Sequence, residues 1–165
     1  AWREAVLYSD GPTALLLSRQ NVPTLDREKF APASGLAKGA YVLADLGESD
    51  PELILMASGS EVGLIVEAGE KLASQGKSVR LVSFPCWELF EKQDQAYRNS
   101  VLPPATKARV SVEAGVSMGW DRWVGPEGKI IGVDHFGASA PYQIVFEKFG
   151  LTADKVVEAG LELIG

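Results

Sequence analysis

The turn Ser58-Gly59-Ser60-Glu61 is the first stretch whose residue types could do chemistry. It separates an apolar run from a helical pattern. Small residues at a helix start leave backbone N–H groups free for a phosphate or carboxylate, so Ser58, Gly59 and Ser60 form a candidate anion or regulatory site. The glycines of a dinucleotide fingerprint and the lysine of a P-loop are absent, and Glu61 would repel an anion. We therefore favour a simpler interpretation, in which Ser58 or Ser60 caps the helix.

A second candidate is Gly115-Val-Ser-Met-Gly119, which matches the Gly-x-Ser-x-Gly nucleophile elbow and follows an expected strand. In a serine hydrolase, Ser117 would attack an ester, His135 would act as the base, and Asp121 or Asp134 would orient the imidazole. Asp134 is adjacent to His135, which is poor geometry for that task. A pattern with three fixed positions also arises easily by chance, and we favour a packed glycine turn.

His135 and Cys86 are the only histidine and the only cysteine. A lone histidine can act as a base near neutral pH, and a thiol at a helix start can become reactive. Phe84 and Trp87 flank the cysteine, however, which favours a packed thiol, and we favour a surface or structural role for the histidine. One His and one Cys do not supply the usual ligands of a zinc site, so we expect no metal in this chain.

Arg19 directly follows the apolar run Thr13–Ser18, which we expect to be a strand buried on both faces. Open α/β sheets place ligands at the carboxyl ends of their strands, and a guanidinium binds phosphate through two parallel hydrogen bonds. Arg19 is therefore a candidate phosphate ligand. The alternative is a charged residue at the point where a strand reaches solvent, and position alone does not separate the two.

A regular alternation of elements would position these residues. We expect a helix tail over residues 2–8 and a linker over residues 25–38, and then strands alternating with helices, which predicts a three-layer α/β/α sandwich. Its five-stranded sheet is mostly parallel, with one antiparallel strand suggested by the tight link between the first two strands. The expected strands are residues 40–44, 52–57, 78–84, 109–113 and 129–134, and the expected helices are 61–75, 87–99, 142–149 and one that begins near Thr152.

Length, composition and charge limit the number of domains and the partners that the chain could have. The 165 residues suffice for one domain, or for one domain and a fragment of another, and 46% of them are hydrophobic. A net charge of −6 argues against nucleic acid and anionic membranes as main partners. No run of about 18 apolar residues is present, and a single cysteine fits a reducing compartment. Because the chain lacks an initiator Met and a signal peptide, we expect Ala1 to be an internal cut.

Taken in order, the motifs resemble those of transketolase. Gly11-Pro-Thr-Ala-Leu-Leu-Leu-Ser-Arg-Gln20 is similar to the last strand of the pyrimidine-binding domain of that family. Later segments are similar to successive parts of the C-terminal domain. They are Lys38–Leu43, Ala57–Val62, Val79–Pro85, Phe90-x-x-Gln93, Tyr97–Pro103, Val112–Gly115 with Gly119-Trp120, and Gly132–Pro141.

The resemblance implies that residues 1–24 are a remnant of the preceding domain and residues 39–165 the C-terminal domain. It also implies that the parent moves a two-carbon ketol unit between sugar phosphates, using thiamine diphosphate and a divalent metal, Mg or Ca. The cofactor site would lie in the missing domains at a homodimer interface, so the fragment alone would be inactive, with no catalytic residue. Arg19 would hold the substrate phosphate. The expected location is the cytoplasm, or the plastid stroma in a plant.

Other interpretations remain open at this stage. The chain could be the equivalent domain of a two-oxoacid dehydrogenase or of deoxyxylulose phosphate synthase, or a free-standing phosphate- or nucleotide-binding module that uses the turn at Ser58. One physical consequence holds for a fragment. A strand at residues 13–18 would have lost its sheet, so we expect residues 1–25 to pack differently than in the parent, for instance across a dimer.

Overall fold

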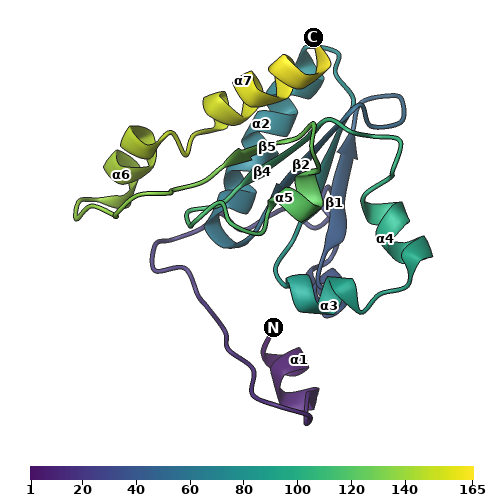
Figure 1. Cartoon of the computed structure of the whole chain (residues 1–165), viewed down its shortest axis with the longest axis vertical. Helices are drawn as coiled ribbons and strands as arrows, with labels where there is room; N and C mark the ends of the chain where they lie inside the picture. The colour runs from purple at the N-terminus through teal and green to yellow at the C-terminus, as the bar shows by residue number, and fades with distance from the viewer.

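A five-stranded sheet lies between two layers of helices in the computed structural model, which describes all 165 residues (Figure 1). This confirms the predicted α/β/α sandwich. The strands are β1 Tyr41–Leu46, β2 Leu53–Ala57, β3 Val79–Ser83, β4 Arg109–Val112 and β5 Lys129–Ile131. The helices are α1 Trp2–Leu7, α2 Val62–Ser74, α3 Trp87–Glu91, α4 Gln95–Val101, α5 Asp121–Val124, α6 Tyr142–Phe149 and α7 Ala153–Ile164, with short 3-10 turns at Ala33–Lys38 and Gly59–Glu61.

The strands are arranged in the order β1-β3-β2-β4-β5. Only β1 is antiparallel, so the predicted sheet type is confirmed. The short link between the first two strands had suggested that they pair with each other, and this was wrong. β1 pairs with β3 and not with β2, the strand that follows it in the chain. All five residues of β2 are fully buried, which matches a central strand with a parallel neighbour on each side.

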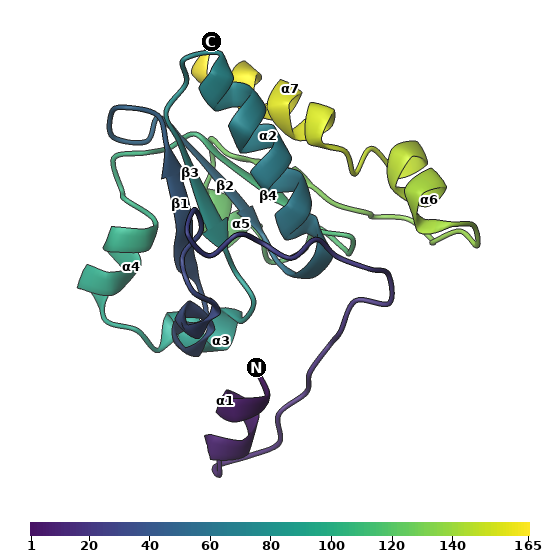
Figure 2. The same ribbon diagram turned by 180° about the vertical axis from the view of Figure 1, so that it is seen from behind.

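Each face of the sheet has its own core. On one face, α2 and α7 cover side chains that include Leu55, Leu81 and Val110. On the other face, the segments around α3, α4 and α5 cover Ile54 and Met56 together with an aromatic cluster, which consists of Phe84, Phe90, Trp120 and Trp123. Figures 1 and 2 show these two helix layers from opposite sides.

The helix expected over residues 87–99 is divided into α3 and α4, and that prediction was wrong. α3 ends at Glu91, and the chain restarts a helix at Asp94, whose carboxylate accepts a hydrogen bond from the backbone N–H of Tyr97 at 2.7 Å. A side-chain cap of this kind stabilises a new helix start and so competes with continuation of the first helix. The last helix begins where expected, and Thr152 caps α7 by accepting a hydrogen bond from the N–H of Lys155.

Residues 1–24, here named the N-terminal arm, extend away from the sandwich (Figure 1). The expected helix is present as α1, but the strand expected at residues 13–18 does not form. A strand needs a hydrogen-bonding neighbour, and the five strands of the sheet leave this segment none. Leu16 is consequently 93% exposed. The first residues of the chain that pack into the core are Leu25, which lies against the cluster beneath α2, and Phe30, which is buried in it.

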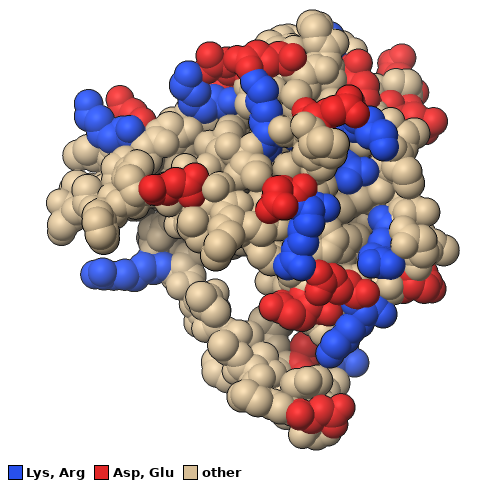
Figure 3. Space-filling view, in the orientation of Figure 1, with Lys and Arg blue, Asp and Glu red and all other residues tan.

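Charges of both signs alternate over the face seen in Figure 3, and the arm carries few of them. None of the helices has both the length and the apolar content that a membrane span requires.

Candidate functional site

The turn at residues 58–61 lies at the carboxyl end of β2, immediately before α2. Ser58 is extended and Gly59 has φ +52°, a left-handed conformation that glycine adopts without strain. Ser58 stands at the N-cap position of the 3-10 turn Gly59–Glu61 that leads into α2, as one of the two expected alternatives had it, but neither serine side chain accepts a capping hydrogen bond. Both hydroxyls instead donate to carboxylates.

Two glutamates occupy the inner side of this turn. The Ser58 hydroxyl donates to Glu113 Oε2 at 2.8 Å, and Glu113 follows β4, the next strand of the sheet. Glu61 is only 3% exposed, accepts from the Ser60 hydroxyl and accepts from the backbone N–H of Ala114 at 3.2 Å. The turn is therefore tied to the end of β4 by two side-chain hydrogen bonds.

The carboxyl groups of Glu61 and Glu113 disfavour the binding of an anion at this turn. Burial raises the pKa of the Glu113 carboxyl above its ordinary value, and the nearby Glu61 adds to the rise, while the hydrogen bond from Ser58 partly opposes it. A bound phosphate would face these carboxyl groups and would compete for serine donors that are already in use. The candidate anion site at Ser58, Gly59 and Ser60 stays a prediction, and the geometry favours a structural role for this turn.

The raised pKa gives a testable pH dependence. Between the ordinary pKa and the raised one, the folded chain binds more protons at Glu113 than the unfolded chain, so the free energy of unfolding falls as pH rises from about 4.5 through the raised pKa. Glu113→Gln stays neutral and still accepts from Ser58. We expect its melting temperature to fall less over this range than that of the unsubstituted chain. Glu70→Gln, at an exposed position of α2, is the matched control, and parallel curves for all three proteins would contradict the assignment.

Two residues of the N-terminal arm, Ser18 and Pro23, lie near this turn and the start of α2. A Cβ atom placed on Gly59 would lie 3.7 Å from the hydroxyl oxygen of Ser18. A Cβ atom on Gly63, in the first turn of α2, would lie 3.4 Å from Cγ of Pro23. Arg19 itself is exposed and makes no hydrogen bond or ion pair. No sequence pattern links the turn to the arm, because about forty residues separate them.

The hydrolase interpretation does not fit the structure. Ser117 donates both its backbone N–H and its hydroxyl to Asp134, each at 2.8 Å, and not to a base. These hydrogen bonds lower the pKa of the exposed Asp134 carboxyl. His135 instead bonds the carbonyl of Phe136 through Nδ1, and its ring packs edge-on against Phe149. The serine therefore faces a carboxylate of lowered pKa, which is a weak base, and not the imidazole that a hydrolase would need.

The remaining candidates are packing groups. Cys86 is half-buried, and burial raises the pKa of its thiol, which keeps the sulfur protonated and unreactive. Trp120 and Trp123 are both buried in the aromatic cluster. No group of three or more His, Cys, Asp or Glu side chains is arranged to hold a metal ion.

Comparison with known proteins decides the family. Residues 39–152 match the family described as the transketolase-like C-terminal domain. The chain belongs to the transketolase family. It is 47% identical over 165 residues to the transketolase of Geobacillus stearothermophilus, covering 100% of this chain and 25% of that protein. It is 50% identical over 164 residues to transketolase 1 of Escherichia coli, covering 99% and 24% respectively.

Solved structures agree with the transketolase assignment. Transketolase from Leishmania mexicana superposes with a TM-score of 0.71 and 44% identity, over 79% of this chain and 18% of that one. A transketolase from Pichia stipitis, in complex with sedoheptulose 7-phosphate, gives a TM-score of 0.77 at 32% identity over 88% and 20%. The chain thus spans about a quarter of the length of the curated transketolases that it matches, and its sandwich is the C-terminal domain.

Proposed function

We propose that the intact protein carrying this chain is a transketolase that transfers a two-carbon ketol group from a ketose phosphate to an aldose phosphate. The observation that carries the proposal is the continuous match of all 165 residues to about a quarter of a transketolase, at 47% identity. Thiamine diphosphate with Mg or Ca would supply the carbanion chemistry. The residues of this chain include no group of His, Cys, Asp or Glu side chains that could hold the metal.

Within this proposal, residues 1–24 belong to the preceding domain, residues 25–38 are the linker and residues 39–165 form the C-terminal domain. Arg19 holds the substrate phosphate, and its exposed, unpaired guanidinium is free to do so. The C-terminal domain supports a homodimer together with the rest of the transketolase chain, and the location is the cytoplasm or, in a plant, the plastid stroma. The residues packed near Phe30 would hold the arm to this domain.

The test compares this chain alone with the same chain completed to full length. Alone, it is expected to melt at the same temperature with and without thiamine diphosphate and Mg. A real site would stabilise it by about 2.7 kcal/mol at a hundredfold excess of ligand over the dissociation constant. Joined to the missing three quarters of transketolase 1 of Escherichia coli, it is expected to support ketol transfer, followed by product formation from two sugar phosphates.

A melting shift in the chain alone would show that it binds the cofactor itself and would contradict the allocation of that site to other domains. A completed protein that is folded, dimeric and inactive would contradict the proposed activity.

A further inference from the structure

The outer edge of β5 has no hydrogen-bonding neighbour. β5 is the last strand of the sheet, and β4 is the only strand that pairs with it. The carbonyl of Ile131 accepts from the N–H of Glu113 at 3.0 Å, so the alternation of a parallel ladder directs the peptide groups of Ile130 and Gly132 away from β4. The backbone of Gly132 makes no hydrogen bond within the chain. A strand laid beside β5 would therefore find free donors and acceptors.

The opposite edge of the sheet, formed by β1, is protected. The carbonyl of Leu43 accepts from the N–H of Ala31 at 2.8 Å, and the register of β1 against β3 shifts between Val42 and Ala44. A covered and irregular edge resists pairing with another chain. The edge that can accept a further strand is thus the one at β5.

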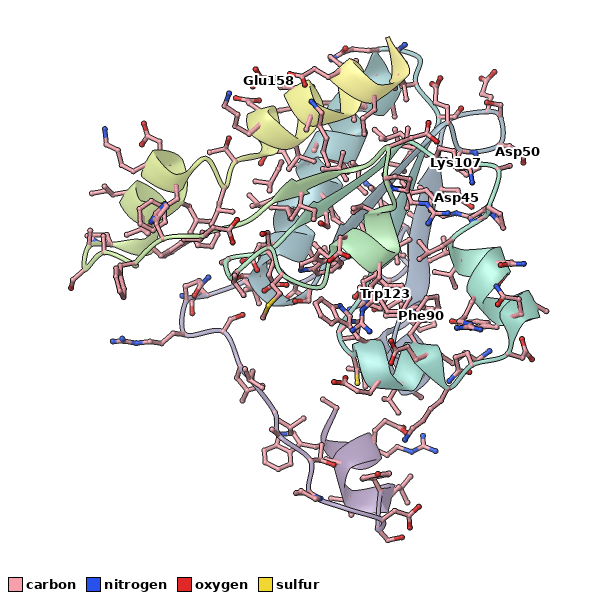
Figure 4. All side chains as sticks on the ribbon, viewed as in Figure 1. Asp45, Asp50, Phe90, Lys107, Trp123 and Glu158 are labelled. Carbon is pink, nitrogen blue, oxygen red and sulfur yellow. The ribbon has the colours of Figure 1, made fainter.

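An open groove of about 390 Å³ lies alongside β5. It is lined by β5, the end of α6 and one side of α7, and its apolar lining residues are Ile130, Ile131, Phe149 and Ala159. On its rim, Lys129 forms an ion pair with Glu162 of α7. Lys155 forms another with Glu158, which Figure 4 labels on α7. Because these charges neutralise one another, the groove suits an uncharged apolar segment better than an ion.

The N-terminal arm contains a segment of this kind. Residues 11–18 carry no charge, and residues 13–18 are mostly apolar and of strand length. Within its own copy the segment pairs with no strand, and Leu16 and Leu17 are 93% and 73% exposed. Side chains alternate along a strand, so Leu15 and Leu17 would share one face and Leu16 would lie on the other. Beside β5, one of these faces would enter the groove next to α7.

We propose that residues 13–18 of one copy add to the free edge of β5 in a second copy, as a sixth strand of that sheet. Each copy has one arm and one free edge, so a reciprocal exchange closes a two-fold dimer. In strand addition, backbone hydrogen bonds supply affinity and alternate side chains fill pockets beside the edge. The inference concerns the 165-residue chain by itself and does not depend on the proposed function, which assigns the same residues to the preceding domain.

The test measures the mass of this chain by analytical ultracentrifugation over a range of concentrations, together with amide hydrogen exchange at Ile130 and Gly132. We expect a dimer that dissociates on dilution, with exchange at both amides slower in the dimer by about tenfold or more. The double variant Leu16→Lys, Leu17→Lys charges both faces of the segment at positions that are exposed in one copy, so it should fold and remain monomeric. Val6→Lys, Leu7→Lys adds the same charge at exposed positions of α1 and should still dimerise.

Three results would overturn the proposal. A monomer with fast exchange at Ile130 and Gly132 would show that the edge of β5 stays unpaired. A monomer with both amides protected at every concentration would show that the arm pairs within its own copy. A dimer that persists in the variant with charged Leu16 and Leu17 positions, or that leaves both amides unprotected, would place the contact elsewhere. Ketol transfer by the completed enzyme is measured separately, so each of these results leaves the proposed function standing.

Discussion

Replacing Gly39 by alanine is expected to be among the most destabilising single changes in this chain, with a loss of about 2–5 kcal/mol. A Cβ atom at this position would lie 2.2 Å from the backbone nitrogen of Phe90 and 2.4 Å from the carbonyl oxygen of Cys86. Both are main-chain atoms, so neither can rotate away. The residue also has φ +85°, which adds about 1–2 kcal/mol of strain for any L side chain, and overpacking adds about 1–3 kcal/mol.

The large effect arises because Gly39 joins two parts of the fold. It lies two residues before β1, and its carbonyl accepts from the N–H of Cys86 at 2.9 Å, at the start of α3. Moving either backbone away to admit a methyl group would disturb the end of an edge strand and the aromatic cluster behind it. Since domains are stable by only about 5–15 kcal/mol, we expect a large drop in melting temperature.

Gly76→Ala is the matched control for Gly39→Ala. Gly76 follows Gln75, the C-cap of α2, and has φ +81°, close to the value at Gly39, but a Cβ atom there would meet nothing within 4 Å. Its substitution therefore measures the cost of a positive φ without any steric crowding, and we expect a loss of about 1 kcal/mol in the free energy of unfolding. Chemical denaturation of both variants gives the comparison. If Gly39→Ala and Gly76→Ala lost the same free energy of unfolding, the backbone around residue 39 would have moved to admit the methyl group. The expected clash with Phe90 and Cys86 would then be contradicted.

The sheet could be predicted from sequence because apolar runs of strand length alternated with helical periodicity. The neighbour of each strand could not be predicted in the same way. A short link between two strands suggests a hairpin, but β1 pairs with β3, because β2 is so apolar that it takes the central position between two parallel strands. Strand order depends on which faces are buried, and this is a property of the whole sheet.

The N-terminal arm shows a second feature that the sequence pattern alone could not predict. Residues 13–18 have the composition of a buried strand, and the pattern is informative, yet no strand forms because none of the five strands pairs with it. A strand is defined by partners as well as by its own residues. The carboxylate of Glu113 was missed for a related reason. It is 55 residues from Ser58, and only the parallel pairing of β2 with β4 brings the two together.

Truncation of Phe84 to alanine is the second large effect expected, at about 3–5 kcal/mol. Its ring is 1% exposed and lies at the centre of the aromatic cluster. The centroid distances are 5.0 Å to Phe90, 5.7 Å to Trp120 and 4.8 Å to Trp123, with the first two pairs edge to face. Figure 4 labels Phe90 and Trp123 within this cluster, between α3 and α5.

The cost should be near the upper end of that range because the cavity cannot close easily. The rings around it are held by one another, with Phe90 and Trp123 only 5.4 Å apart, and the backbone N–H of Phe84 is fixed to the carbonyl of Ala57 at 2.8 Å. Rigid walls leave more of the removed volume empty, and the loss of stability grows with that volume.

Phe136→Ala provides the control for Phe84→Ala, since its ring is 99% exposed and its truncation should change stability by no more than about 0.5 kcal/mol. Urea denaturation followed by far-UV circular dichroism measures both variants. Tryptophan fluorescence adds a local readout, because Trp120 and Trp123 line the expected cavity. A loss below about 1.5 kcal/mol for Phe84→Ala would mean that the aromatic cluster collapses into the space. In that case the segments around α3 and α5 would be able to shift toward the sheet, and the core beneath α2 and α7 would contribute more to the stability of the domain than the aromatic cluster does.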